Sequence, residues 1–196
     1  PDGDIDHRAI RHMINKSLNA GCSVVMLTWG NSLISLLSDD EVAEVHTTVA
    51  DCVADTALLV ACDNMWGLPK CVEFARYVRN IGFHVYMVRP PDTMPGTPET
   101  LADYYKEVAN EIPLMLVGQV PLATCESLED VPGVCSFKED ASVDYAHEVG
   151  MRWGDRWTIV GGGGLRRHHL LAPHGWCPAW LDYFMCSYPQ PAFDYW

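Results

Sequence analysis

One lysine stands apart from the others by its position in the predicted secondary structure. The chain has four lysines, and Lys16, Lys70 and Lys106 fall on segments with helical spacing, where we expect them to face solvent. Lys138 instead ends an apolar run of strand length at residues 134–137. Functional side chains of parallel α/β folds gather at the carboxyl ends of strands. Lys138 is therefore the first candidate for a catalytic residue.

A lysine in such a place can act as a nucleophile. Partial desolvation favours the neutral amine, which attacks a carbonyl carbon and forms a Schiff base. The protonated imine then withdraws electrons from the adjacent carbon. The alternative is structural, with Lys138 in an ion pair with Glu139 or Asp140, which follow it directly. The residues alone leave both interpretations open.

A second cation closes another apolar strand. Arg89 directly follows the run at residues 83–88. Its guanidinium is suited to bidentate binding of a carboxylate, so we predict that Arg89 reaches the same site as Lys138 and holds an acidic substrate. The alternative is a surface ion pair with Asp92 or another acid.

Two further groups of residues are weaker candidates. Gly161 and Gly162, with the two glycines that follow, could form a backbone nest for phosphate, or only a close-packed turn. His168, His169 and His174 could bind a metal ion, but adjacent histidines point apart on a helix and no nearby acid completes a set. We expect no metal site.

The elements that must position these groups alternate between strands and helices. Helices are predicted to begin after Asp6, Ser38 and Thr97, and Ser38 with Glu41 forms a capping box. The apolar strands, which are typical of a parallel sheet covered on both faces, lie at residues 22–28, 57–62, 83–88, 114–117, 134–137, 157–160 and 177–181. This repeat predicts a single α/β domain over residues 1–196, a (β/α)8 TIM barrel, with a doubly wound sheet as the alternative. Because a barrel usually takes about 250 residues and eight strands, we expect the first strand and the C-terminal helices to be absent.

Composition narrows the range of partners. Lys+Arg total 13 and Asp+Glu total 26, which gives a net charge of −13. Nucleic acid and membrane surfaces both need a basic face, so we expect neither as a partner. No apolar run approaches the roughly 18 residues of a transmembrane helix, and no signal peptide is visible. The eight cysteines form no CxxC pair, which predicts buried reduced thiols in a cytoplasmic protein.

Several of these segments resemble one known family. Residues 133–142 (GVCSFKEDAS) look like the Schiff-base segment of the dihydrodipicolinate synthase/N-acetylneuraminate lyase family. Residues 19–41 are similar, without gaps, to the segment that carries its GTTGE motif and the L-[ST]-x-E-E that follows. Residues 83–91 match its strand ending in Pro-Pro, and residues 118–121 (GQVP) occupy the place of its YNVP. The resemblance runs in register over nearly the whole chain.

The resemblance implies a (β/α)8 barrel with lysine-dependent (class I) aldolase or dehydratase chemistry on 2-oxo acids such as pyruvate. It implies Lys138 as the Schiff-base lysine, no cofactor, and a homo-oligomer that is usually a tetramer built from dimers. Besides Arg89, which we add from its position, the expected substrate-binding residues are Gly30, Asn31, Ser32, Gln119, Gly161 and Gly162.

The sequence departs from the family pattern at several positions. GTTGE is WGNSL at residues 29–33, and Gly118 stands at the place of the catalytic tyrosine, which moves protons. The arginine that follows YNVP aligns with Ala123, and the tyrosines after Pro-Pro align with Asp92 and Thr93. These changes predict an acid–base system that differs from that of the synthase.

The favoured function is therefore a lyase that acts on a 2-oxo acid through a Schiff base on Lys138, as an aldolase or a dehydratase. One alternative is a non-catalytic or regulatory member of the family that binds a small carboxylate. The other is a phosphate-binding barrel enzyme that uses the glycines beginning at Gly161.

Overall fold

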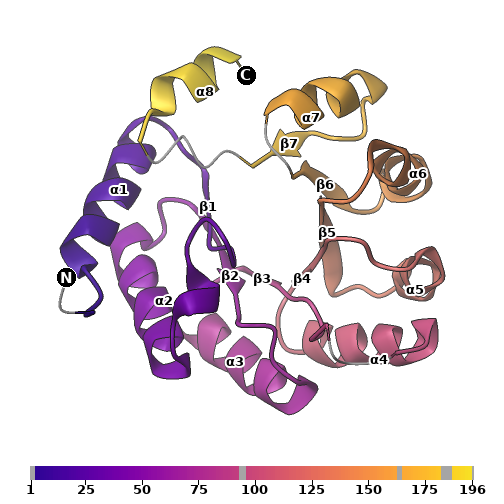
Figure 1. The fold of residues 1–196 in the computed structure, drawn as a ribbon, viewed down its shortest axis with the longest axis horizontal. Helices are drawn as coiled ribbons and strands as arrows, with labels where there is room; N and C mark the ends of the chain where they lie inside the picture. Colours follow the sequence, from indigo (N-terminus) through magenta and orange to yellow (C-terminus); the bar gives the residue numbers. More distant parts are fainter. Residues whose placement is uncertain (1–2, 93–95, 163–164, 182–186, 196) are drawn as a thin grey trace. The chain divides into compact units, whose positions relative to one another are not determined.

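The computed structural model describes residues 3–92, 96–162, 165–181 and 187–195, which form two compact units. The first unit takes in the described residues of Pro1–Asn64, Tyr77–Val85 and Tyr183–Trp196, and the second those of Met65–Arg76 and Tyr86–Asp182. Both units contain strands that alternate with helices (Figure 1). The prediction of one domain over residues 1–196 stays a prediction.

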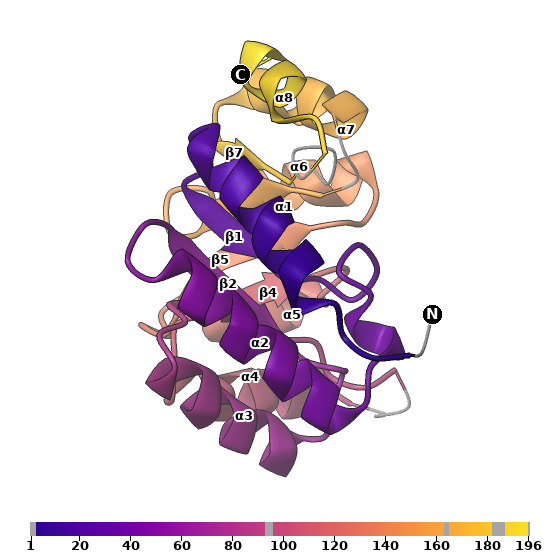
Figure 2. The same cartoon turned by 90° about the vertical axis from the view of Figure 1, so that its left-hand side faces the viewer.

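The first unit begins with a helix where the sequence predicts one. Its elements are α1 (His7–Asn19), β1 (Val24–Met26), the 3-10 turn η1 (Ile34–Leu36), α2 (Asp39–Val53), β2 (Leu58–Cys62) and, at the C-terminal end, α8 (Pro189–Tyr195). The Asp6 carboxylate accepts a hydrogen bond from the Ala9 amide at 2.9 Å and so caps α1. Helices α1 and α2 lie side by side (Figures 1 and 2), and β1 pairs with β2 in parallel.

Local signals fix the start of α2. The Ser38 hydroxyl accepts from the Glu41 amide at 3.3 Å, and the Glu41 carboxylate accepts from the Ser38 amide at 2.7 Å. This is the predicted capping box, which satisfies two amides that the first helical turn leaves without partners.

The second unit holds most of the sheet. Its elements are β3 (Val85–Met87, the first residue of which belongs to the first unit), α4 (Pro98–Ala109), β4 (Leu114–Val117), α5 (Leu122–Leu128), β5 (Val134–Glu139), α6 (Val143–Trp153), β6 (Thr158–Gly161), α7 (Leu165–Leu171), the 3-10 turn η2 (Ala172–His174) and β7 (Ala179–Trp180). Helix α3 (Leu68–Asn80) is shared between the units. Strands β3 to β7 pair in parallel and in chain order. A doubly wound sheet would reverse its order, so these strands follow the order of a (β/α)8 barrel.

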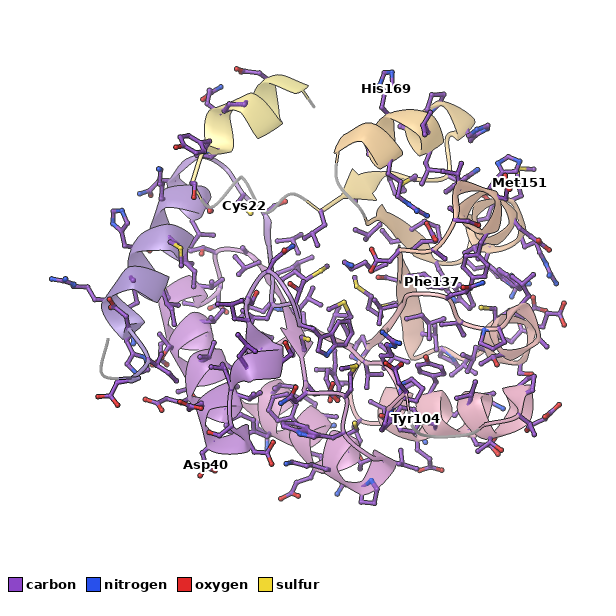
Figure 3. The ribbon with its side chains drawn as sticks, viewed as in Figure 1. Cys22, Asp40, Tyr104, Phe137, Met151 and His169 are labelled. Atoms are coloured by element: carbon purple, nitrogen blue, oxygen red, sulfur yellow. The ribbon has the colours of Figure 1, made fainter. Side chains whose placement is uncertain are left out.

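The core of this unit determines which way β5 faces. Successive side chains of a strand point to opposite faces. Phe137 is fully buried and meets Tyr145 of α6 and Trp157 edge-on, with ring centroids 6.4 Å apart in each case. Figure 3 shows Phe137 on β5, in the part of the unit that lies toward α6. Lys138, the next residue, therefore lies on the opposite face, away from this helix layer.

Several element bounds differ from the predicted ones for physical reasons. Strand β5 runs to Glu139, two residues beyond the predicted end, because its ladder with β6 continues to the pair Glu139–Gly161. Strand β1 is shorter than predicted, with three residues. The sequence predicts no helix at residues 189–195, where α8 contains Pro189 and Pro191. Both prolines fall in the first turn of α8, where no intrahelical amide donor is needed.

The described helices include none that is both long and apolar enough to cross a membrane. The seven cysteines in the described residues are free thiols, of which Cys62, Cys71, Cys125 and Cys177 are buried and the other three half-buried. Burial raises the pKa of the Cys125 thiol to about 12. Such thiols pack as small apolar groups.

Candidate active site

Lys138 lies where the sequence predicts, at the carboxyl end of a parallel strand. It is 8% exposed and stands opposite Val117 of β4 and Val160 of β6. Its ammonium Nζ donates to the Asp140 carboxylate, with which it forms an ion pair. The structure thus combines the two interpretations that the sequence leaves open, since a buried strand-end lysine is also paired with an acid.

The other lysines lie on helices, as predicted. Lys16 on α1 is exposed. The Nζ of Lys70 on α3 lies 4.2 Å from the ring centroid of Trp66. Lys106 on α4 pairs with Asp103 at 3.8 Å and its side chain is 42% exposed. Lys138 is the buried member of the four.

Glu139 takes a different partner on the other face of β5. Its side chain is fully buried, and its carboxylate accepts from the guanidinium of Arg167 on α7 and, at 2.6 Å, from the Ala141 amide. Burial raises the pKa of Glu139 in spite of the neighbouring guanidinium. Arg167 also donates to the carbonyl oxygens of Ala141 and Ser142. The guanidinium therefore ties the segment after β5 to α7.

Sequence reasoning missed the role of Arg167. The available signal was a cation close behind an apolar strand in a chain with a net charge of −13. That signal marks a residue as unusual, but the partner comes from a segment 28 positions away.

Gly161 and Gly162 serve close packing. The Gly161 carbonyl oxygen accepts from the Leu181 amide at 3.1 Å, and the Gly162 amide donates to the Glu139 carbonyl oxygen at 2.9 Å. A Cβ on Gly162 would collide with the Asp140 carboxylate. With that amide committed and a carboxylate against it, this half of the glycine run forms a close-packed turn and offers phosphate no donor at Gly162. The two following glycines lie outside the described residues.

Gly118 fixes the end of β4 against β5. Its amide donates to the Lys138 carbonyl oxygen at 3.1 Å, and its backbone has a φ of +79°, a conformation that favours glycine. Gln119 is exposed. Val120 accepts a hydrogen bond from the Tyr145 hydroxyl through its carbonyl oxygen. The role of Gln119 in binding substrate stays a prediction.

Arg89 forms the ion pair that was the alternative to its role as an anchor. Its guanidinium contacts the Asp92 carboxylate, with the two side chains 44% and 67% exposed. Arg89 also lies near enough to Tyr105 to oppose the rise in the pKa of that buried phenol. Its contact with a substrate carboxylate stays a prediction.

We expect Arg89→Ala to change stability by at most about 1 kcal/mol, because an exposed ion pair contributes no more than that. If Arg89 exchanges Asp92 for a substrate carboxylate, the same variant weakens binding of a 2-oxo acid at least about tenfold, through the loss of a charge-assisted hydrogen bond. Isothermal titration calorimetry with pyruvate measures the Kd of the wild-type chain and of Arg89→Ala. A Kd that stays within about a factor of two in the folded variant would remove Arg89 from the site.

Gly30, Asn31 and Ser32 belong to the first unit. The Ser32 hydroxyl accepts from the Thr28 amide at 3.1 Å, and the Gly30 carbonyl oxygen accepts from the Leu33 amide at 3.1 Å. Gly30 and Asn31 are exposed. These bonds shape the loop after β1, and the part that the three residues play in binding a substrate stays a prediction.

The histidines near the C-terminal end point apart. His168 is buried, and this burial lowers its pKa, whereas His169 is exposed on the outer side of α7 (Figure 3). The His174 ring lies 4.6 Å from the ring of His147 on α6. Within the described ranges, no three potential ligands lie close enough together to hold a metal ion.

Parallel strands in chain order, alternating helices and a buried strand-end lysine place the molecule among the (β/α)8 barrel proteins. The model of the dihydrodipicolinate synthetase family matches residues 1–171. The chain belongs to this family.

Individual relatives agree with that assignment. A 4-hydroxy-tetrahydrodipicolinate synthase of Xanthomonas campestris pv. campestris is 24% identical over 173 residues, which are 83% of this chain and 57% of that protein. The chain thus spans less than two thirds of the length of this relative.

Solved structures show the same fold at lower identity. Dihydrodipicolinate synthase from Oceanobacillus iheyensis superimposes with a TM-score of 0.87 at 16% identity, over 98% of this chain and 67% of that one. The chloride-inhibited synthase of Acinetobacter baumannii, complexed with pyruvate, superimposes with a TM-score of 0.85 at 15% identity. The match covers 96% of this chain and 68% of that one. These likenesses confirm the predicted barrel class over the doubly wound sheet.

Proposed function

We propose that this protein is a lyase that acts on a 2-oxo acid of the pyruvate type through a Schiff base on Lys138. The observation that carries the proposal is the position of Lys138, buried at the carboxyl end of β5 on the face away from the helix layer. Membership of the dihydrodipicolinate synthetase family and the pyruvate complex of the Acinetobacter baumannii protein support it.

The chemistry needs only an amine and a means of moving protons. The Lys138 amine attacks the ketone carbon, and loss of water leaves a protonated imine. This imine accepts the electron pair of a neighbouring bond, so the enzyme can break a carbon–carbon bond as an aldolase or expel water as a dehydratase. No cofactor enters this scheme.

The remaining predicted site residues would bind the 2-oxo acid substrate. Donors from Gly30, Asn31 and Ser32, together with Arg89 and Gln119, are the proposed binding groups for the substrate. Gly161 and Gly162 would border the bound substrate as a close-packed turn, without a donor from the Gly162 amide. We further propose a cytoplasmic homo-oligomer, a dimer or a tetramer, as the family resemblance implies.

Hydrogen exchange at pyruvate tests the proposed chemistry. An enamine gains and loses protons at the methyl carbon, so the protein should exchange pyruvate methyl protons in deuterated water faster than buffer alone. Proton NMR follows the loss of the methyl signal, and a panel of other 2-oxo acids with a hydrogen on that carbon identifies the substrate class. Exchange at the protein-free rate with every member of the panel would contradict the proposal.

A second candidate function is favoured by the ion pair of Lys138 with Asp140, because a paired ammonium is not a nucleophile. In that case the protein binds a small carboxylate without covalent chemistry. Saturable pyruvate binding without exchange and without a reducible adduct would identify this function.

A further inference from the structure

The carboxylate of Asp140 lies beside the amine that we propose as the nucleophile. Asp140 follows the last residue of β5, and its carboxylate contacts the Nζ of Lys138. The Lys138 side chain is 10% exposed and the Asp140 side chain 32%. The lysine is thus nearly out of water, whereas the acid keeps some contact with it and can exchange a proton.

The backbone across the sheet leaves room for this carboxylate. Gly162 follows β6, one step beyond the ladder pair of Glu139 with Gly161. A side chain at Gly162 would occupy the space of the Asp140 carboxylate and lie 2.8 Å from the Glu139 carbonyl oxygen. Glycine at this position therefore allows Asp140 to stay beside Lys138.

Two other acid–base groups close to Lys138 along the chain or the sheet are committed elsewhere. The Glu139 carboxylate is paired with Arg167 on the opposite face of β5. The Tyr145 hydroxyl donates to the Val120 carbonyl oxygen. Gly118 has no side chain with which to move a proton. Among these groups, Asp140 is the one in contact with the proposed reacting nitrogen.

We propose that Asp140 is the acid–base group of imine formation at Lys138. The inference rests on the proposed function, and it gives the ion pair a catalytic purpose. Because the carbinolamine oxygen sits on the carbon bonded to Nζ, a carboxylate that touches Nζ is also within reach of that oxygen.

The proton balance is closed within the pair. Asp140 takes a proton from the Lys138 ammonium, which gives a neutral amine and a carboxylic acid. The amine electron pair forms the new bond to the ketone carbon, the carbonyl π pair moves to oxygen, and transfer of a nitrogen proton to that oxygen gives the carbinolamine. Asp140 then donates its proton to the hydroxyl, which leaves as water while the nitrogen lone pair forms the imine double bond. The products are a protonated imine, one water molecule and the Asp140 carboxylate.

A purely electrostatic role of Asp140 and a role in proton transfer predict opposite effects of its removal on the rate of imine formation. If Asp140 only holds Lys138 as an ammonium ion, its removal frees the amine and speeds every reaction of the amine. If Asp140 moves the proton, its removal slows imine formation even though the amine is freer. General acid–base catalysis contributes about 10²–10⁴-fold, so the two roles differ in sign as well as in size.

The experiment compares the wild-type chain with Asp140→Asn, Gly162→Ala and, as a control, Asp144→Asn. Asp144 is exposed in the first turn of α6, and its substitution removes the same charge without touching the pair. Pyruvate is added, borohydride quenches at timed intervals, and mass spectrometry gives the rate at which adduct forms. Arylation of Lys138 by trinitrobenzenesulfonate, mapped by peptide, measures reactivity that requires no departure of water.

We expect Asp140→Asn to form adduct at least about tenfold more slowly, with arylation of Lys138 unchanged or faster. Asp144→Asn should match the wild type. Gly162→Ala keeps the carboxylate but displaces it, so it should also slow adduct formation, and it decides the question if Asp140→Asn does not fold. Adduct formation as fast as in the wild type, in whichever of these two variants folds, would overturn the role of Asp140. A folded wild-type chain that forms no adduct would instead overturn the proposed function.

Discussion

Arg167→Ala should lower the free energy of unfolding by about 3–5 kcal/mol, because it leaves the fully buried Glu139 carboxylate without its counter-charge. The side chain of Arg167 is 14% exposed, so water cannot readily replace the guanidinium. Urea unfolding followed by circular dichroism measures the loss. Arg156→Ala serves as a matched control, since Arg156 pairs with Asp130 at the surface and its loss should matter far less.

The deficit of Arg167→Ala should also depend on pH. Burial already raises the pKa of Glu139, and removal of the guanidinium raises the pKa further. When a carboxyl group has a higher pKa in the folded than in the unfolded state, the free energy of unfolding of the protein falls as pH rises. The stability that Arg167→Ala loses should therefore be smaller at about pH 5 than at about pH 8. The double variant Glu139→Gln with Arg167→Ala should recover part of it. A deficit below about 1 kcal/mol at both pH values would show that the buried pair does not hold α7 to β5.

Lys138→Met should abolish reaction with 2-oxo acids altogether. No amine remains at the strand end, so neither reducible adduct nor accelerated methyl exchange is expected. The folded state should survive, because methionine fills the volume of the lysine stem and the Asp140 side chain, which is 32% exposed, retains access to water. Mass spectrometry after borohydride reduction and the NMR exchange assay measure the two losses.

Lys70→Met is the matched control for Lys138→Met. Lys70 lies on α3, where it is half-buried with its Nζ over the ring of Trp66. Its substitution removes one amine from a helix and leaves Lys138 in place. This variant should form adduct as the wild type does. Adduct formation that persists in Lys138→Met at the wild-type rate would contradict the assignment of the nucleophile.

Features that short segments determine were predicted correctly. The caps at Asp6 and Ser38 depend on residues three positions apart, and both are present. The continuous apolar runs predicted parallel strands because only strands covered on both faces bury every side chain. The position of Lys138 at a strand end follows from the same pattern, which is why one residue could be singled out from the sequence.

Features that depend on distant partners were not predicted. The pairing of Glu139 with Arg167, and the space that Gly162 leaves for Asp140, join segments of separate strand–helix units. The sequence offered both Glu139 and Asp140 as partners of Lys138. Lys138 pairs with Asp140 because side chains alternate along β5. Glu139 lies on the same face as Phe137, where its carboxylate cannot reach the Nζ of Lys138. Strand pairing, which extends β5 to Glu139, sets this alternation.

The residue that carries pyruvate after reduction gives the most direct test of the lysine-dependent mechanism. The full chain is incubated with pyruvate, reduced with borohydride, digested and mapped by mass spectrometry. The predicted result is one modified peptide, with a single reduced pyruvyl group on Lys138. A label on Lys16, Lys70 or Lys106 in place of Lys138, or no label on a chain that circular dichroism shows to be folded, would contradict it.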